Sequence, residues 1–233
     1  MSTVEVESQE EQMTEGMRKE GSDGPDSQEN DLLNLFSKHR IENLIDAIYA
    51  FSMTLLVTTI EIPSATNLTH SFTVDSIMLQ ILPNLISYFS AFILLATFWW
   101  INHVRFHYLR TTDQTLIIIN VLSLSFVALV PFTTRLAGFF PLNFHAAIIF
   151  ELNLLIIGIL SVLQWWYIIR KPQLIVENVD PKKLAENQAK TLVFPILSVV
   201  GITLALLSIP GSVFIYLFVP LFVWIIGTWW RKS

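Results

Sequence analysis

Six apolar stretches recur between residues 41 and 230, separated by shorter polar segments. Each is close to the roughly 20 residues that an α-helix needs to cross the hydrocarbon core of a bilayer. Their approximate limits are 41–62, 79–102, 115–135, 143–168, 191–209 and 211–230. Proline, glycine or charged residues lie at every junction, as expected where such helices end. The pattern predicts an all-α, polytopic membrane protein with six transmembrane helices.

The first apolar stretch carries a narrow stripe of small and polar residues along one side. At about 100° per residue, eight positions share one arc, with Phe51 at its edge: Asn43, Asp46, Ala47, Ala50, Thr54, Val57, Thr58 and Glu61. An ionisable side chain in a spanning helix costs a few kcal/mol and normally faces protein or water. The stripe is therefore either a packed seam or the wall of an aqueous path.

Composition agrees with a membrane protein and divides the chain into two regions. Of the 233 residues, 53% are hydrophobic and 14% are charged, and the mean hydropathy is +0.56. The net charge of −5 conceals an acidic segment, residues 1–37, followed by a mildly basic remainder. Because residues 1–37 are polar and poor in aromatic residues, we expect a disordered cytoplasmic tail there. Residues 38–233 are expected to form one six-helix transmembrane domain.

The basic residues near the segment ends predict the orientation. With six spans, Arg135 falls on one side, and the other side holds Lys38, Arg40, Arg105, Arg110, Arg170, Lys171, Lys182, Lys183, Lys190, Arg231 and Lys232. The positive-inside rule then places both termini in the cytoplasm. Paired tryptophans at 99–100, 165–166 and 229–230 lie at the same ends, as in an interfacial aromatic belt. Asn67 would lie outside, in a weak N-glycosylation pattern.

The sequence contains few motifs that would indicate an enzyme. There is no cysteine, no glycine-rich phosphate loop and no nucleophile elbow. His103 and His107, four residues apart, are weak grounds for a metal site. We expect no enzymatic activity, no cofactor, no metal and no nucleic-acid partner. The filter sequence of P-loop potassium channels is also missing.

Three acids in or near the apolar stretches are candidates for function. Asp46 is expected to be a hydrogen-bonded anchor at the cytoplasmic end of the first helix rather than an ion ligand. Glu61 either concentrates cations at the outer mouth or is simply a solvated helix-end residue. Glu151, with His145 before it, is expected to be a buried hydrogen-bonding residue rather than a proton relay. The last stretch, 211–230, is apolar all round and is expected to face lipid.

Three segments together resemble the endosomal/lysosomal transmembrane potassium channel family in its single-repeat, prokaryotic form. Arg40-Ile-Glu-Asn-Leu-Ile-Asp46 is similar to the first-helix signature, Arg, three residues, Phe-Ser-Asp, with Leu44-Ile45 in place of Phe-Ser. Phe98-Trp-Trp-Ile-Asn-His103 is similar to the Trp/Asn/His segment of the second helix. The run from Asp113 through Asn120 to Thr134 is similar to the third helix. The resemblance covers most of residues 38–230.

The resemblance implies a potassium-permeable cation channel without a P-loop. Single-repeat members are homotetramers in which four copies of helix one line a central pore. Phe51 aligns with the ring of bulky apolar residues that gates the pore, in place of the usual Ile or Leu. Thr54 aligns with a threonine linked to potassium preference, and Thr58 with a second pore-facing layer. A polar network at the cytoplasmic end would comprise Arg40, Asp46, Trp100, Asn102 and His103.

Ala50 and Glu61 share the helix-one arc with these positions, so we expect them to line the pore as well. The implied partners are potassium ions, membrane lipid and three further copies of the chain. Two alternatives stay open. One is a proton-coupled or organic-ion secondary transporter that uses Asp46, Glu151 and His145 as relays. The other is a non-conducting membrane scaffold in which the stripe is a helix-packing seam.

Overall fold

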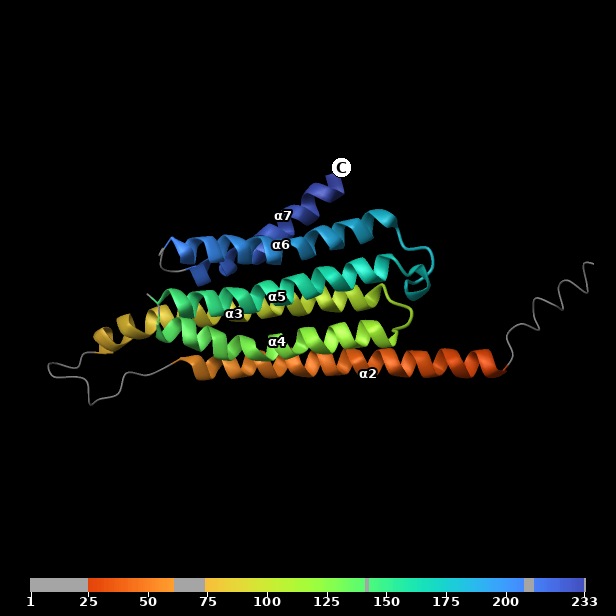
Figure 1. Ribbon diagram of the computed structural model, residues 1–233, viewed down its shortest axis with the longest axis horizontal. Coiled ribbons are helices and arrows are strands. Elements are labelled where there is room, and N and C mark those ends of the chain that lie inside the picture. Colours follow the sequence, from red (N-terminus) through yellow and green to blue (C-terminus); the bar gives the residue numbers. More distant parts are fainter. Residues whose placement is uncertain (1–24, 61–73, 141–142, 208–211, 233) are drawn as a thin grey trace, which may run out of the picture.

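The computed structural model is a bundle of long helices that run side by side (Figure 1). It describes residues 25–60, 74–140, 143–207 and 212–232. The elements in order are α2 (Pro25–Leu55), the 3-10 helix η1 (Leu56–Thr59), α3 (Val74–His107), α4 (Gln114–Phe139), α5 (Phe144–Ile169), η3 (Pro172–Leu174), α6 (Pro181–Leu206), η4 (Ser212–Phe218) and α7 (Val219–Lys232). The predicted all-α class is confirmed. Glu61 and Asn67 lie outside the described residues.

Among the described residues, five helices are long and apolar enough to cross a membrane, and the sixth predicted span is divided. Its first part is the 3-10 helix η4, and α7 begins only at Val219. Pro220 fits this break, because proline is tolerated in the first turn of an α-helix but not in its interior. The expectation that this segment faces lipid all round is wrong, since Tyr216 is 1% exposed and Val219 is also buried.

Two helices begin earlier than the apolar runs predicted. α2 starts at Pro25, inside the segment expected to be a disordered tail. α6 starts at Pro181 rather than near residue 191, because Asp180 accepts a hydrogen bond from the backbone N–H of Lys182 and Pro181 occupies the first helical turn. Both residues are standard signals for a helix start. The first turns of α6 are charged and lie beyond the apolar core of the span.

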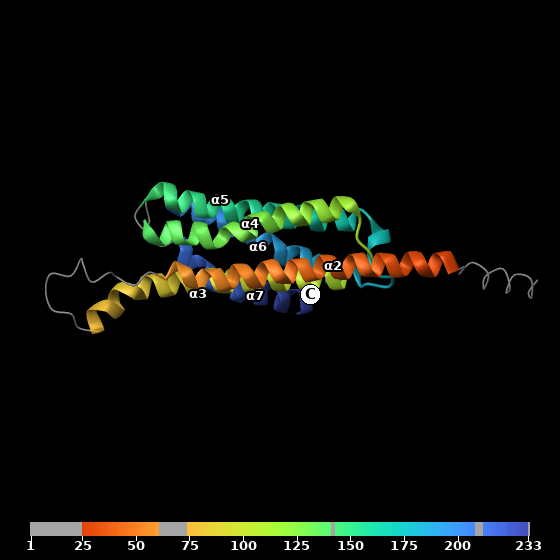
Figure 2. The ribbon, with the colours of Figure 1, turned by 90° about the horizontal axis from the view of Figure 1, so that it is seen from below.

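Helices α4 and α5 lie side by side in one layer, with α2 and α3 on the other side of the bundle (Figure 2). α5 also packs closely against α6 at two glycines. A Cβ atom added at Gly158 would lie 2.9 Å from Cδ of Pro195. A Cβ atom added at Gly201 would overlap the carboxylate of Glu151. Small residues of this kind permit close approach of helices within a membrane.

We expect Gly201→Ala to destabilise the bundle by about 1–3 kcal/mol, the usual cost of overpacking a filled interior. The added methyl group must displace the buried Glu151 side chain. Gly138→Ala is the matched control, since the nearest atom of another helix to its Cβ atom would be Oδ1 of Asn84, at 3.9 Å. Thermal unfolding of both variants in detergent measures the difference. Equal unfolding temperatures would contradict tight packing at Gly201.

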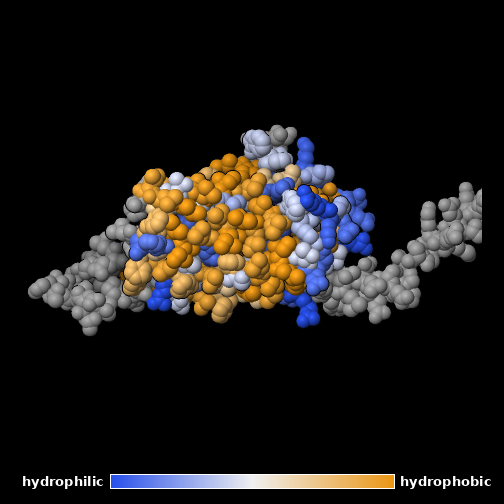
Figure 3. Space-filling view, in the orientation of Figure 1, coloured by the Kyte–Doolittle hydropathy of each residue, from blue (hydrophilic) through white to orange (hydrophobic). Residues whose placement is uncertain are grey.

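A broad apolar surface covers the middle of the bundle, and hydrophilic residues gather at its right-hand end in Figure 3. Contacts of α2 and of the connecting segments hold that end together. Nζ of Lys38 donates to the carbonyl oxygen of Leu109 at 2.6 Å, and Arg110 pairs with Glu177 at 3.5 Å. The fold therefore brings together the segments whose basic residues predicted a cytoplasmic side. The orientation itself stays a prediction.

Candidate functional site

The polar stripe of the first helix lies on the outside of the protomer. Its described members are all exposed: Asn43, Asp46, Ala47, Ala50, Thr54, Val57 and Thr58. Phe51, beside them, is 64% exposed. The opposite face of α2 and η1 packs into the bundle through the buried residues Ile45, Tyr49, Ser52 and Leu56. The stripe is therefore not an internal seam of one protomer.

The two threonines of the stripe have their hydroxyl donors already occupied. Oγ1 of Thr54 donates to the carbonyl oxygen of Phe51 at 2.7 Å, and Oγ1 of Thr58 donates to that of Leu55 at 2.7 Å. A hydroxyl carries one donor and two acceptor lone pairs. With the donor used by the backbone, each oxygen keeps acceptor capacity on an exposed face. Such oxygens are suitable ligands for a hard cation.

At the predicted cytoplasmic end, Asp46 contacts a tryptophan that the sequence analysis did not select. Nε1 of Trp99 donates to Oδ1 of Asp46 at 2.7 Å, whereas Trp100 is 57% exposed. The ring of His103 stacks on Trp99 with centroids 5.6 Å apart. Trp99 thus joins Asp46 and His103. Arg40 is exposed and, within the described part of the chain, has no hydrogen bond to this group.

Asn102 belongs to a second, buried network centred on Arg105. Nδ2 of Asn102 donates to the hydroxyl oxygen of Tyr49 at 2.8 Å, and Nη1 of Arg105 donates to Oδ1 of Asn102 at 2.8 Å. Nη2 of Arg105 donates to Oγ of Ser161 at 2.5 Å, and Nη1 also contacts Gln164. Arg105 is 1% exposed. The network connects the pore-candidate helix α2, through α3, to α5.

Sequence reasoning placed Arg105 among the cytoplasmic charges and missed this role. Ser161 and Gln164 are the polar residues of the otherwise apolar run 154–166, and they lie three residues apart, on one face of a helix. That spacing was the available signal. No carboxylate among the described residues forms an ion pair with Arg105, so neutral oxygens and the ring of Trp165, 5.6 Å from the guanidinium carbon, surround the charge.

Glu151 is fully buried in α5, as expected from the sequence. Its carboxylate accepts a hydrogen bond from the hydroxyl of Tyr216 in η4, and the same Tyr216 hydroxyl lies 3.4 Å from Oγ of Ser198. His145 is exposed at the start of α5. The geometry gives the three relay candidates different surroundings, since Glu151 bonds Tyr216 and Asp46 bonds Trp99.

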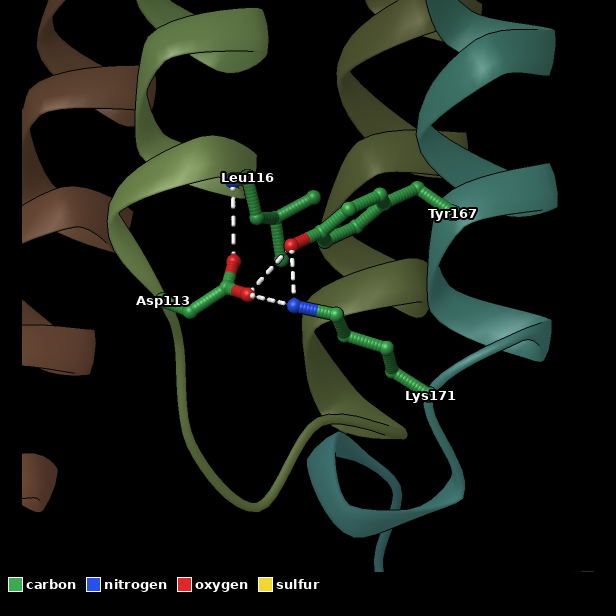
Figure 4. Close-up of polar contacts among 4 residues, drawn as sticks. All are labelled: Asp113, Leu116, Tyr167 and Lys171. Carbon is green, nitrogen blue, oxygen red and sulfur yellow. Dashed lines mark hydrogen bonds and ion pairs between the residues drawn. The ribbon is translucent and has the colours of Figure 1, made fainter.

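A polar cluster ties the start of α4 to the end of α5 (Figure 4). Asp113 caps α4 by accepting from the backbone N–H of Leu116 at 3.0 Å. Nζ of Lys171 donates to Oδ2 of Asp113 at 2.8 Å and to the hydroxyl oxygen of Tyr167 at 2.6 Å. Desolvation acts to raise the pKa of Asp113, but the hydrogen bonds from Lys171, Tyr167 and Leu116 outweigh it and lower that pKa.

We expect Asp113→Asn to lower the unfolding temperature by a few degrees at neutral pH. Asparagine keeps the helix cap but loses the charge that faces Lys171. Because folding lowers the pKa of Asp113, its stabilisation is present above the ordinary value of 3.8 and is lost as the pH falls through the lowered value. Unfolding of wild type and variant should therefore converge in acid. A difference that is independent of pH would contradict this assignment.

These features together define an integral, multi-pass membrane protein. Residues 40–131 match the family model described as endosomal/lysosomal potassium channel TMEM175. A potassium channel of Streptomyces collinus is 26% identical over 148 residues, which are 60% of this chain and 69% of that protein. The crystal structure of a lysosomal potassium-selective channel TMEM175 homologue from Chamaesiphon minutus aligns with a TM-score of 0.68 at 23% identity, covering 80% of this chain and 98% of that one.

The chain is thus similar to members of the TMEM175 family, which are described as channels, and the resemblance found in the sequence is confirmed. Among animal relatives, the chicken endosomal/lysosomal proton channel TMEM175 is 28% identical over 116 residues, 47% of this chain. The match spans 23% of that relative, so the matched part of this chain covers about a quarter of its length.

Proposed function

We propose that the chain forms an oligomeric, potassium-permeable cation channel in which copies of α2 surround the pore. The observation that carries the proposal is the outward position of the polar stripe. A stripe that includes Asp46, Thr54 and Thr58 would be costly against lipid. Assembly around α2 removes that cost by giving the stripe an aqueous or protein environment. The relatives described as potassium channels also support this proposal.

In this proposal Phe51 forms the narrowest, apolar part of the pore. It is the large aromatic residue that borders the stripe midway between Asp46 and Thr58, and its ring projects from the protomer. Rings of apolar side chains gate pores by excluding water. Thr54 and Thr58 lie one and two turns further along α2 and η1, where their oxygens replace part of the hydration of a passing ion. Ala50 and Glu61 complete the proposed lining.

We further propose that four copies assemble, as the family resemblance implies. The mouth at the predicted cytoplasmic end would be shaped by Asp46, held by Trp99. Asn102 and His103 would support that end from α3, while Arg40 and Trp100 would lie at its exposed rim.

The two alternatives are less well supported by the described contacts. A proton-coupled transporter needs a connected relay, whereas Glu151 bonds Tyr216, Asp46 bonds Trp99 and His145 is exposed. A non-conducting scaffold needs the stripe to be a dry seam between protomers.

The chicken relative is described as a proton channel, so permeation of both potassium and protons must be measured.

The test is flux through purified full-length protein in liposomes, with potassium and proton gradients applied separately. Accessibility of an introduced cysteine then places the pore, and the absence of native cysteine makes the background clean. A charged thiol reagent should block Thr54→Cys. It should not affect Leu56→Cys, which is buried in the protomer, or Leu221→Cys, which is exposed on the apolar surface of α7.

Three outcomes would overturn the proposal. Purified protein that passes no cation would remove the channel function. If the thiol reagent blocks Leu221→Cys but not Thr54→Cys, the aqueous path does not lie along α2. Saturable uptake driven by a second gradient would favour the transporter. The assembly size, measured by mass spectrometry of the intact complex, tests the tetramer separately.

A further inference from the structure

A groove of about 530 Å³ lies between α3, α6 and α7, and of its lining residues only Trp100 has a place in the proposed pore. Part of its lining is apolar, with Ile101 and Val104 from α3 and Val223 from α7. The remainder is polar and comes mainly from α6. The groove is therefore amphipathic, with an apolar side and a charged side contributed by different helices.

The charged side is a single face of the first turns of α6. Lys183, Glu186, Asn187 and Lys190 all line the groove, and their spacing of three, four and seven residues places them along one side of a helix. Nζ of Lys190 contacts Oε1 of Glu186 at 2.6 Å, so the acid is already neutralised. Lys183, which is exposed, then gives the groove a net positive charge.

The backbone of α7 closes on this ion pair. A Cβ atom added at Gly227 would lie 3.2 Å from Cε of Lys190 and 3.3 Å from Oε1 of Glu186. The pair is consequently held between two helices, with the side chains of Lys190 and Glu186 20% and 18% exposed. The polar side of the groove is thus packed in place rather than formed by loose surface lysines.

Aromatic residues mark the level of the groove relative to a bilayer. Trp100 and Tyr108 line it, and such side chains prefer the interface between acyl chains and headgroups. The groove also lies at the end of the bundle that carries most of the basic residues, which the positive-inside rule assigns to the cytoplasm. The inner leaflet there is rich in anionic lipids.

The position in the bundle leaves the groove open to lipid in the proposed assembly. α6 and α7 lie on the opposite side of the bundle from α2 (Figure 1). If copies of α2 meet at a central axis, α6 and α7 are at the perimeter. The groove then faces the bilayer.

We propose that this groove binds one anionic phospholipid of the inner leaflet. The phosphate is held by Lys183 and the amide of Asn187, next to the neutralised Lys190–Glu186 pair. The acyl chains follow Ile101, Val104 and Val223 toward the apolar surface. The exposure of the groove to lipid rests on the proposed assembly around α2, but lipid binding does not depend on ion conduction and is measured separately from it.

The experiment is mass spectrometry of the intact protein, released from bilayers of equal parts phosphatidylcholine and phosphatidylserine. We expect phosphatidylserine to be retained preferentially. Lys183→Gln should reduce that preference about fivefold, since each basic residue near an anionic leaflet contributes about 1 kcal/mol. Lys182→Gln is the matched control, because Lys182 is an exposed neighbour with the same charge that does not line the groove.

A second variant, Val223→Trp, fills the apolar side and should release bound lipid without changing any charge. Inorganic phosphate is added in a separate arm. Equal retention of the two lipids, or an equal effect of Lys182→Gln and Lys183→Gln, would overturn the proposal. Displacement of the lipid by inorganic phosphate alone would show a site for the free anion and would also overturn it.

Discussion

Phe51→Ala is expected to raise cation flux through the reconstituted protein by roughly tenfold or more. In the proposed pore every subunit contributes one Phe51 side chain to an apolar constriction. The energetic barrier to a hydrated ion is the cost of wetting that constriction. A barrier reduced by about 1.4 kcal/mol already gives a tenfold rate. Removing all the rings from one constriction readily exceeds that reduction. No other single substitution on the stripe removes as much apolar surface.

Flux is measured with a potassium-selective dye in liposomes at matched protein density. Phe132→Ala is the control, since Phe132 is a similarly exposed aromatic residue, 62% exposed, on α4 rather than on α2. Flux through Phe51→Leu should lie between that of wild type and that of Phe51→Ala, because one leucine from each subunit re-forms an apolar constriction. Unchanged flux in Phe51→Ala, or an equal increase in Phe132→Ala, would remove Phe51 from the constriction.

The sequence predicted the faces of the first helix correctly, although it did not predict the partners of each face. Helical periodicity placed Thr54, Thr58 and Asp46 on one side, and the structure exposes that side. Periodicity gives angular position, and angular position alone decides which residues share a surface. Whether that surface meets water, lipid or another subunit depends on assembly. The pore role of the stripe therefore stays a prediction.

The missed contacts have a common cause. Asp46 bonds Trp99 rather than Trp100, a difference of one position and about 100° around α3. A motif resemblance conveys which residue types occur together, but it does not fix the rotation of one helix against another. Tyr216 was likewise assigned to lipid because an apolar run has no periodic signal. Its hydroxyl, which contacts Glu151, was the clue that one side is buried.

Substituting Arg105 is expected to cause the largest loss of stability. Its guanidinium is the common donor to Asn102, Ser161 and Gln164, so Arg105→Met leaves several buried acceptors without a partner. Each unsatisfied buried group costs about 1–3 kcal/mol, and we expect a total loss of about 3 kcal/mol or more. Relief from burying a charge offsets part of this cost. Arg105→Lys should lose less, because a lysine keeps the charge but lacks the planar fork.

The measurement is thermal unfolding in detergent, compared with Arg110→Met. Arg110 lies at the polar end with its side chain 53% exposed in a pair with Glu177, so its loss should cost less than about 1 kcal/mol. Adding Gln164→Leu and Ser161→Ala to Arg105→Met removes two of the three orphaned acceptors and should recover part of the loss. Asn102 also donates a hydrogen bond to Tyr49 of α2. If stability is recovered but potassium flux is altered, the network positions the pore helix.

If Arg105→Met unfolds at the same temperature as Arg110→Met or at a higher one, the guanidinium of Arg105 does not stabilise the interior of the bundle.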